Sequence, residues 1–194
     1  EGADGASFAG ALSSMRLRWG ILAQFFYVGA QVCMASFFIK MATTSAGLDE
    51  DTAAKYLGFY GLAFMIGRFA GTFFMQYIQP RKLLIIYSII TILLSVLAII
   101  GTGMVVVYTL IAIAFFMSIM FPTIFSMGID GLGHNTKIGS SLIVMSIVGG
   151  ALLPPVLGYI SDITGSIQNG YIVPLICFSV ILLFAFNGHK TNKA

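Results

Sequence analysis

Long apolar runs divide the chain, and short polar segments separate one run from the next. The runs cover, in order, residues 16–40, 54–77, 83–100, 105–127, 138–160 and 171–186. About 20 apolar residues let a helix cross a bilayer, and tilt accommodates runs that are somewhat longer or shorter. The pattern therefore predicts an all-α membrane protein with six transmembrane helices. An even number of spans places both ends of the chain on the same side of the membrane.

The composition agrees with a membrane protein. Hydrophobic residues make up 58% of the 194 residues and charged residues only 9%, whereas about 25% is usual for a soluble domain. The net charge of +3 is too small to indicate a nucleic-acid partner. Cys33 and Cys177 lie singly inside apolar runs, so their spacing indicates neither a disulfide framework nor a metal site.

The distribution of Lys and Arg predicts the orientation. With six spans, one side of the membrane receives Arg16, Arg18, Arg81, Lys82, Lys137, Lys190 and Lys193. The other side receives Lys40, Lys55 and the acidic segment 49–51. Because positive residues collect on the cytoplasmic side, both termini are predicted to be cytoplasmic. Residues 1–15, rich in Gly, Ala and Ser, are predicted to be a cytoplasmic linker, residues 16–190 a six-helix bundle, and residues 191–194 a cytoplasmic tail.

Arg68 is the one charge deep inside a run. About ten residues separate it from the polar stop at 79–82, which corresponds to roughly 15 Å of helix. A cation near the bilayer midplane costs at least ~2.5 kcal/mol and must therefore face protein or water. Arg68 is a candidate for substrate binding or coupling; alternatively, it ties helices together through backbone carbonyls.

Polar residues also follow one face of the first run. Gln24, Tyr27 and Gln31 are spaced three and four apart, so they share one side of a helix near mid-bilayer. Their amides and phenol could hydrogen-bond a polyhydroxylated ligand, or they could join neighbouring helices.

Prolines interrupt the fourth and fifth runs. Pro122 frees a backbone carbonyl and bends the fourth helix, with Ser118 and Phe121 just before it. The ring of Phe121 could stack on the apolar face of a sugar, or it could pack in the core or against lipid. Glycines occur in the second and fifth runs. Gly67 and Gly71 in the second run predict close helix packing. The fifth run carries Gly149 and Gly150 together with Pro154 and Pro155.

Two other membrane classes have little support. An intramembrane protease needs a nucleophile and a base at depth, but His134 and His189 fall in polar end segments and no GxSxG motif occurs. The chain is therefore not expected to be an enzyme. A channel would need a filter or repeated charged elements, and none is recognisable.

Four segments carry a resemblance to a known family. They are FFYVGAQ at 25–31, IGRFAGT at 66–72, MSIMFPTIFSMGI at 117–129 and GLGHNTKIGSSLIVMSIVGG at 131–150. Together they resemble the fucose:proton symporter branch of the major facilitator superfamily, which includes L-fucose permeases and glucose/galactose transporters. The resemblance extends over nearly all of residues 16–186.

The resemblance implies that the chain is the C-terminal half of such a transporter, a bundle with a 3+3 inverted repeat, and that residues 1–15 are the remnant of a central loop. It implies a proton-coupled monosaccharide symporter of the bacterial inner membrane, working by alternating access without a cofactor. Its partners would be the sugar, the N-terminal six-helix half and the lipid bilayer. The sugar-binding residues it implies are Gln24, Tyr27, Gln31, Arg68, Ser118 and Phe121.

Two details refine this expectation. Met120 and Phe121 stand where fucose permeases carry Gln-Tyr, which is more similar to glucose/galactose transporters. The runs contain no Asp or Glu at depth, so the resemblance implies that the proton-coupling acids belong to the other half. Carriage of another small polar solute is the alternative, with a six-helix channel or a dimeric membrane protein less well supported.

Overall fold

The computed structural model describes residues 7–187, and within that range the chain is helical with no β-strand. The predicted tail at 191–194 lies outside the described residues, as do His189, Lys190 and Lys193. Residues 1–6 of the predicted linker also lie outside them.

The described helices account for all the apolar runs. They are α1 (Phe8–Ser13), α2 (Met15–Ser36), α3 (Phe38–Ala46), α4 (Glu50–Phe74), α5 (Pro80–Ile100), α6 (Met104–Met117), α7 (Met120–Ile129), η1 (Gly133–Asn135), α8 (Thr136–Met145), η2 (Ser146–Val148), α9 (Gly149–Thr164), α10 (Ile167–Gly170) and α11 (Ile172–Asn187). Five stretches are long and apolar enough to cross a membrane. The pair α2 and α3, bent by 52° at Phe37, supplies a sixth. The predicted all-α fold with six spans is confirmed.

Local chemistry explains where the spans begin and end. Gly47 follows α3 with a φ of 65°, a left-handed conformation that glycine adopts without strain. Asp49 then caps α4, because its carboxylate accepts the N–H of Thr52 at 2.9 Å. Pro80 is the first residue of α5, a position where its missing N–H costs no helical hydrogen bond.

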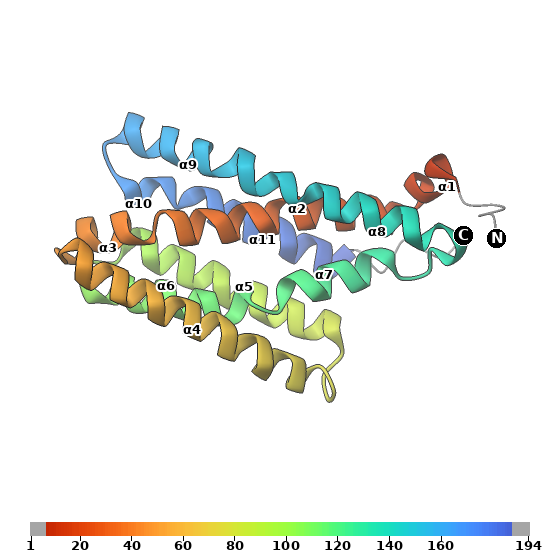
Figure 1. The fold of residues 1–194 in the computed structure, drawn as a ribbon, viewed down its shortest axis with the longest axis horizontal. Helices are drawn as coiled ribbons and strands as arrows, with labels where there is room; N and C mark the ends of the chain where they lie inside the picture. The colour runs from red at the N-terminus through yellow and green to blue at the C-terminus, as the bar shows by residue number, and fades with distance from the viewer. Residues whose placement is uncertain (1–6, 188–194) are drawn as a thin grey trace.

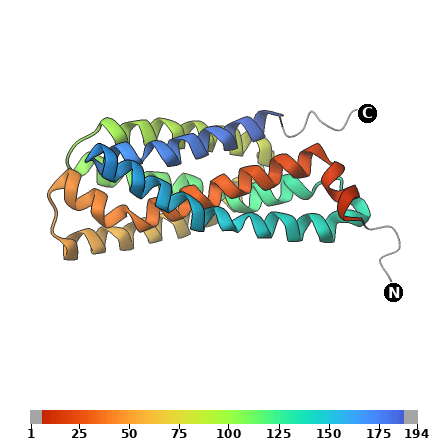
Figure 2. The same ribbon diagram turned by 90° about the horizontal axis from the view of Figure 1, so that it is seen from above.

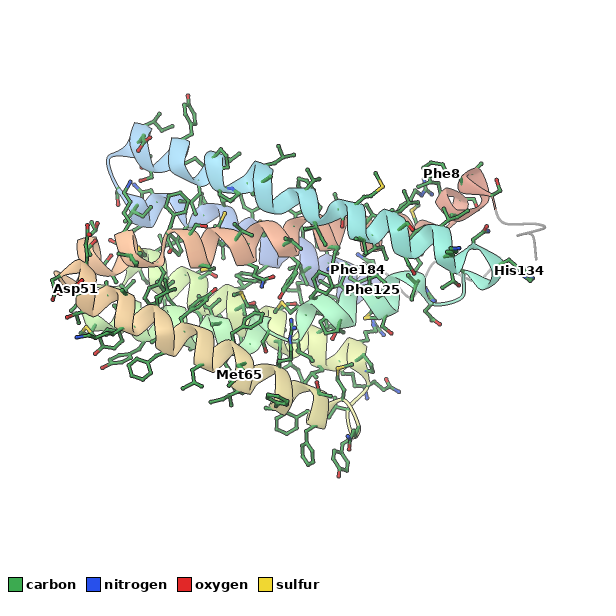
Figure 3. The ribbon with its side chains drawn as sticks, in the orientation of Figure 1. Phe8, Asp51, Met65, Phe125, His134 and Phe184 are labelled. Atoms are coloured by element: carbon green, nitrogen blue, oxygen red, sulfur yellow. The ribbon has the colours of Figure 1, made fainter. Side chains whose placement is uncertain are left out.

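Helices α2, α6 and α7 lie at the centre of the bundle (Figures 1 and 2). Helix α2 packs against α7, α9 and α11, and α6 packs against α4 and α5. Helix α2 begins and α11 ends at the end of the bundle that carries His134, and Asp51 lies at the opposite end (Figures 1 and 3). We call the end with His134 the terminal end.

The outer spans are unequally covered. Among the 18 most apolar consecutive residues of each span, 17% are buried in α4 and 22% in the α8–α9 span. In the other three continuous spans this buried share is 39% to 56%. Met65 on α4 points away from the bundle and is 51% exposed (Figure 3). These two spans therefore present faces that lipid or another part of the protein can cover.

The described part of the predicted linker contains the short helix α1. The Ser7 backbone N–H donates to Asn135 Oδ1 at 2.9 Å, and Ala11 is buried beside Leu17 and Ile143. This segment is thus docked on η1 and α8, a contact that its small-residue composition did not indicate. The proposed boundary between linker and bundle stays a prediction.

Candidate functional site

The fourth span is interrupted between α6 and α7, where Ser118 and Ile119 leave the regular helix. Pro122 lies four residues after Ser118 and has no N–H, so the Ser118 carbonyl lacks its usual helical donor. An unpaired carbonyl inside a membrane costs free energy, and another group has to satisfy it.

Arg68 supplies that group from α4. Its Nε and Nη2 both donate to the Ser118 carbonyl oxygen at 3.4 Å, and its guanidinium carbon lies 5.2 Å from the centre of the Phe64 ring. These hydrogen bonds are longer than the usual ~2.7–3.2 Å, so they are weak and can be exchanged. Arg68 remains exposed at the surface of the described bundle. The sequence indicated an arginine at depth and a freed carbonyl, and the structure pairs the two.

Tyr27 reaches the same break from α2. Its hydroxyl donates to the Met117 carbonyl oxygen at 3.0 Å. Its ring is wholly buried and meets Phe121 edge to face, with the ring centres 6.1 Å apart. Two helices therefore hold consecutive carbonyls of the break, Tyr27 binding Met117 and Arg68 binding Ser118. We call this arrangement the clamped break.

Ser118 contributes its backbone rather than its side chain. Its hydroxyl donates to the Phe115 carbonyl within α6 at 2.7 Å and is buried. It also lies against Gly67, where a Cβ would come within 2.7 Å of the Ser118 Oγ. The side chain does not face an open cavity in this arrangement.

The two glutamines of the predicted strip differ. Gln24 is wholly buried, and neither amide atom has a partner among the described residues. Gln31, two turns further along α2, is half-buried. The structure thus brings Tyr27, Arg68, Ser118 and Phe121 together at the break, leaves Gln24 enclosed in the bundle, and shows no hydrogen bond from Gln31 to a described residue.

The glycines of α4 explain how closely the helices approach. A Cβ on Gly67 would overlap the Phe115 carbonyl, and one on Gly71 would lie 2.8 Å from Ile119 Cβ. Gly58 and Gly61 have open space instead. The close packing predicted for Gly67 and Gly71 is therefore present, and it brings Arg68 to the break.

Sequence reasoning missed two features of the break and one at the terminal end of the bundle. The Met117 carbonyl and the Phe64 ring could not be singled out, because backbone acceptors and phenylalanines occur throughout such a chain. The ion pair between Arg16 and Asp130 was also missed. Its signal was present, because Arg16 opens one span and Asp130 closes another on the same side of the membrane.

The site carries donors, acceptors and an aromatic ring but no titratable acid. Within residues 7–187 no cluster of His, Cys, Asp and Glu could hold a metal ion, and Cys33 and Cys177 are buried free thiols. Arg68 can donate, the two carbonyls can accept, and Phe121 offers a flat apolar face. These are hydrogen-bonding groups and an apolar surface that a polyhydroxylated molecule can use.

Comparison with known proteins gives a consistent result, although no protein-family profile matches the chain. The L-fucose-proton symporter of Escherichia coli K12 is 42% identical over 184 residues, which is 92% of this chain and 42% of that protein. A putative glucose/galactose transporter of Helicobacter pylori 26695 is 42% identical over 179 residues, 90% of this chain and 44% of its own length. The glucose/galactose transporter of Brucella abortus (9-941) is 37% identical over 174 residues, 89% of this chain and 42% of its own length. These relatives are transporters rather than enzymes, as the sequence predicts.

The fold agrees with the sequence relatives. The crystal structure of the major facilitator superfamily transporter FucP in the outward conformation superposes with a TM-score of 0.91 and 41% identity. The match covers 95% of this chain and 46% of that one, so the chain spans somewhat less than half the length of its relatives. The chain is thus a multi-pass membrane protein whose sequence and fold are similar to those of fucose:proton symporters and glucose/galactose transporters of the major facilitator superfamily.

Proposed function

We propose that the chain forms the C-terminal half of a proton-coupled monosaccharide symporter that works by alternating access. The observation that carries the proposal is the likeness, in sequence and fold over about 90% of the chain, to an L-fucose-proton symporter and to glucose/galactose transporters. The missing partner is the N-terminal six-helix half, which covers the open faces of α4 and the α8–α9 span.

The clamped break is the proposed sugar contact in this half. Arg68 is exposed and its two hydrogen bonds to Ser118 are long, so a sugar hydroxyl can compete for its donors. Phe121 supplies a ring for the apolar face of the sugar, and Tyr27 positions both the ring and the Met117 carbonyl. Gln31 is accessible enough to contribute, whereas Gln24 contributes only in a conformation that separates α2 from its neighbours.

Proton coupling requires an acidic side chain inside the membrane, and this half supplies none among its described residues. The acids of the described spans are Asp49, Glu50, Asp51, Asp130 and Asp162, all near helix ends. The N-terminal half therefore supplies the carboxylate that takes up the proton, and no cofactor takes part. In a bacterial inner membrane the terminal end of the bundle faces the cytoplasm, because most of the Lys and Arg lie at that end.

Uptake by the complete transporter tests this function. Cells or proteoliposomes carrying it are given labelled L-fucose, glucose and galactose, with and without an inward proton gradient. Accumulation of one of these sugars that collapses with the gradient is expected. Equal uptake with and without the gradient, or uptake of none of them, would contradict the proposal.

Arg68→Ala should abolish that uptake with membrane insertion intact, because the substitution removes the guanidinium donors at the break. Lys55→Ala is the matched control, since Lys55 is an exposed cation on the same helix, far from the break. Undiminished transport by the Arg68 variant would exclude it from the site.

A further inference from the structure

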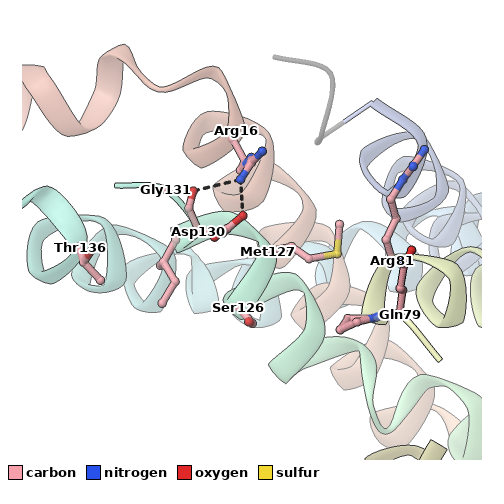
Figure 4. Close-up of a pocket in the computed structure, with 10 residues that line it drawn as sticks. Arg16, Gln79, Arg81, Ser126, Met127, Asp130, Gly131 and Thr136 are labelled. Carbon is pink, nitrogen blue, oxygen red and sulfur yellow. Dashed lines mark hydrogen bonds and ion pairs between the residues drawn. The ribbon is translucent and has the colours of Figure 1, made fainter. Parts of the chain in front are cut away.

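A pocket of about 580 Å³ lies at the terminal end of the bundle, away from the clamped break. The beginning of α2, the turn between α4 and α5, and the end of α7 form its walls. Its lining includes the side chains of Arg16, Gln79, Arg81, Ser126 and Asp130 (Figure 4). The proposed sugar site uses none of these residues.

Arg16 is held in this wall with a donor to spare. Its Nη1 forms the ion pair with the Asp130 carboxylate and also donates to the Asp130 carbonyl oxygen at 3.2 Å (Figure 4). Its Nε is buried without a partner among the described residues. The Arg16 side chain is 15% exposed, whereas that of Asp130 is 72% exposed. A ligand in the pocket cannot reach the enclosed Nε atom. The donor left for an incoming acceptor is the Nη2 of Arg16, which makes no hydrogen bond to a described residue.

Arg81 adds a second fixed cation. Its Nε donates to the Ala185 carbonyl at 2.8 Å and its Nη2 to the Phe186 carbonyl at 3.2 Å, which holds the guanidinium at the end of α11. Helix α5 begins beside it at Pro80, and Gln79 provides no side-chain cap for the first N–H groups. The N-terminal end of a helix carries partial positive charge, which adds to that of the arginines.

Positive charge therefore exceeds negative charge in the pocket, with two guanidinium groups against one carboxylate. Guanidinium groups suit the oxygens of phosphate, which they bind through paired N–H donors. We propose that this pocket binds a phosphate group, with Arg16 as its direct cationic contact and Arg81 adding positive charge to the wall. Asp130 opposes the anion, because phosphate competes with the carboxylate for Arg16.

The phosphate can belong to an anionic phospholipid headgroup or to a soluble phosphate ion. Rings at the end of α4 and in the turn after it favour the lipid: Phe73 and Tyr77 are 55% and 74% exposed and precede Gln79 by a few residues. Exposed aromatic rings beside basic residues are typical of the membrane interface. Acyl chains could lie on these rings while the headgroup enters the pocket.

The thermal stability of the complete transporter tests the proposal without relying on sugar transport. In one arm the purified protein is reconstituted in phosphatidylcholine nanodiscs with increasing phosphatidylglycerol. In the other arm inorganic phosphate is added, at constant ionic strength, to protein in a neutral detergent. A saturable rise in Tm in the first arm identifies a lipid headgroup, and one in the second identifies soluble phosphate.

Three variants separate a phosphate site from general surface charge. Arg16→Gln should weaken the response by about tenfold or more, because charge-assisted hydrogen bonds are lost. Arg18→Gln removes the same charge two residues away, outside the pocket, and should leave the response unchanged. Asp130→Asn should strengthen it, although it breaks the same ion pair as Arg16→Gln.

Opposite effects at Arg16 and Asp130 would distinguish phosphate binding from a merely structural ion pair. Equal losses in the Arg16 and Arg18 variants, losses in both ion-pair variants, or no response in either arm would overturn the proposal.

Discussion

The fourth and fifth spans carry the same sequence signal, a proline inside an apolar run, yet they fold differently. At Pro122 the chain leaves the helix just before the proline, and Arg68 donates to the freed Ser118 carbonyl. At Pro154 and Pro155 helix α9 continues through both residues. The interruption of that span is the 3₁₀ turn η2 at Ser146–Val148, well before the prolines.

Different neighbours explain this contrast. A proline inside a span removes a helical hydrogen bond, but the fourth span has a cation on α4 that can replace it. No side chain among residues 7–187 donates to the Gly150 or Ala151 carbonyl, the two that Pro154 and Pro155 leave without a helical donor. In the fifth span the irregular turn instead precedes Gly149, which lies against the backbone of α2. A proline thus marks a site only where the fold supplies a partner for the carbonyl.

The largest expected effect comes from closing the contact in the fifth span. A Cβ at Gly149 would overlap the Phe25 carbonyl oxygen, a backbone atom that cannot move aside. Gly149→Ala should therefore lower the free energy of unfolding by about 1–3 kcal/mol, the usual cost of overpacking. Thermal unfolding of the purified transporter, followed by loss of monodispersity, measures it.

Gly150→Ala is the matched control for that contact. A Cβ there meets the side chains of Val32 and Val28, at 2.9 and 3.1 Å, and these can shift. The control should be much milder than Gly149→Ala. Equal effects of the two variants would show that α2 and α9 do not approach as closely as described.

The pairing of Arg68 with Pro122 is tested by a double-mutant cycle. Arg68→Ala leaves the Ser118 carbonyl without this donor and should cost about 0.5–1.5 kcal/mol of stability. Pro122→Ala restores an N–H that can reach the same carbonyl, so the double variant should lose less than the sum of the single ones. A coupling energy of roughly 0.5–1.5 kcal/mol is expected.

The fifth span again supplies the control. Pro154→Ala also restores a helical N–H, but Arg68 does not contact the carbonyl involved, so its cycle with Arg68→Ala should be additive. Coupling of similar size in both cycles would mean that prolines act through overall helix stability rather than through the clamped break.

The sequence was sufficient for the spans and for an interruption of the fourth span near Pro122. The pairing of Arg68 with the Ser118 carbonyl could not be predicted from the sequence, because it depends on how α4 is rotated against α6. Gly67 and Gly71 fix that rotation only once both helices are in place. The helical face of Gln24 and Tyr27 was also predictable, but not that Tyr27 would find a carbonyl and Gln24 no partner. The bend at Phe37 has no Gly or Pro nearby and therefore no local signal.

The smallest expected effect concerns the far end of α4, the helix that carries Arg68 to the break. The Thr52 backbone N–H, and then its hydroxyl, hydrogen-bond the Asp49 carboxylate and lower its pKa below the ordinary value of about 4. Because the pKa is lower in the folded state, the cap stabilises the protein above pH ~4 and loses this contribution as pH falls through the folded pKa. Asp49→Asn keeps a capping oxygen that does not titrate. The difference in Tm between the two proteins should therefore be constant at neutral pH and shrink on acidification. A difference that stays constant down to pH 3 would show that the charge of the Asp49 carboxylate adds nothing to the cap, and α4 would then be positioned by its packing against α3 and α6.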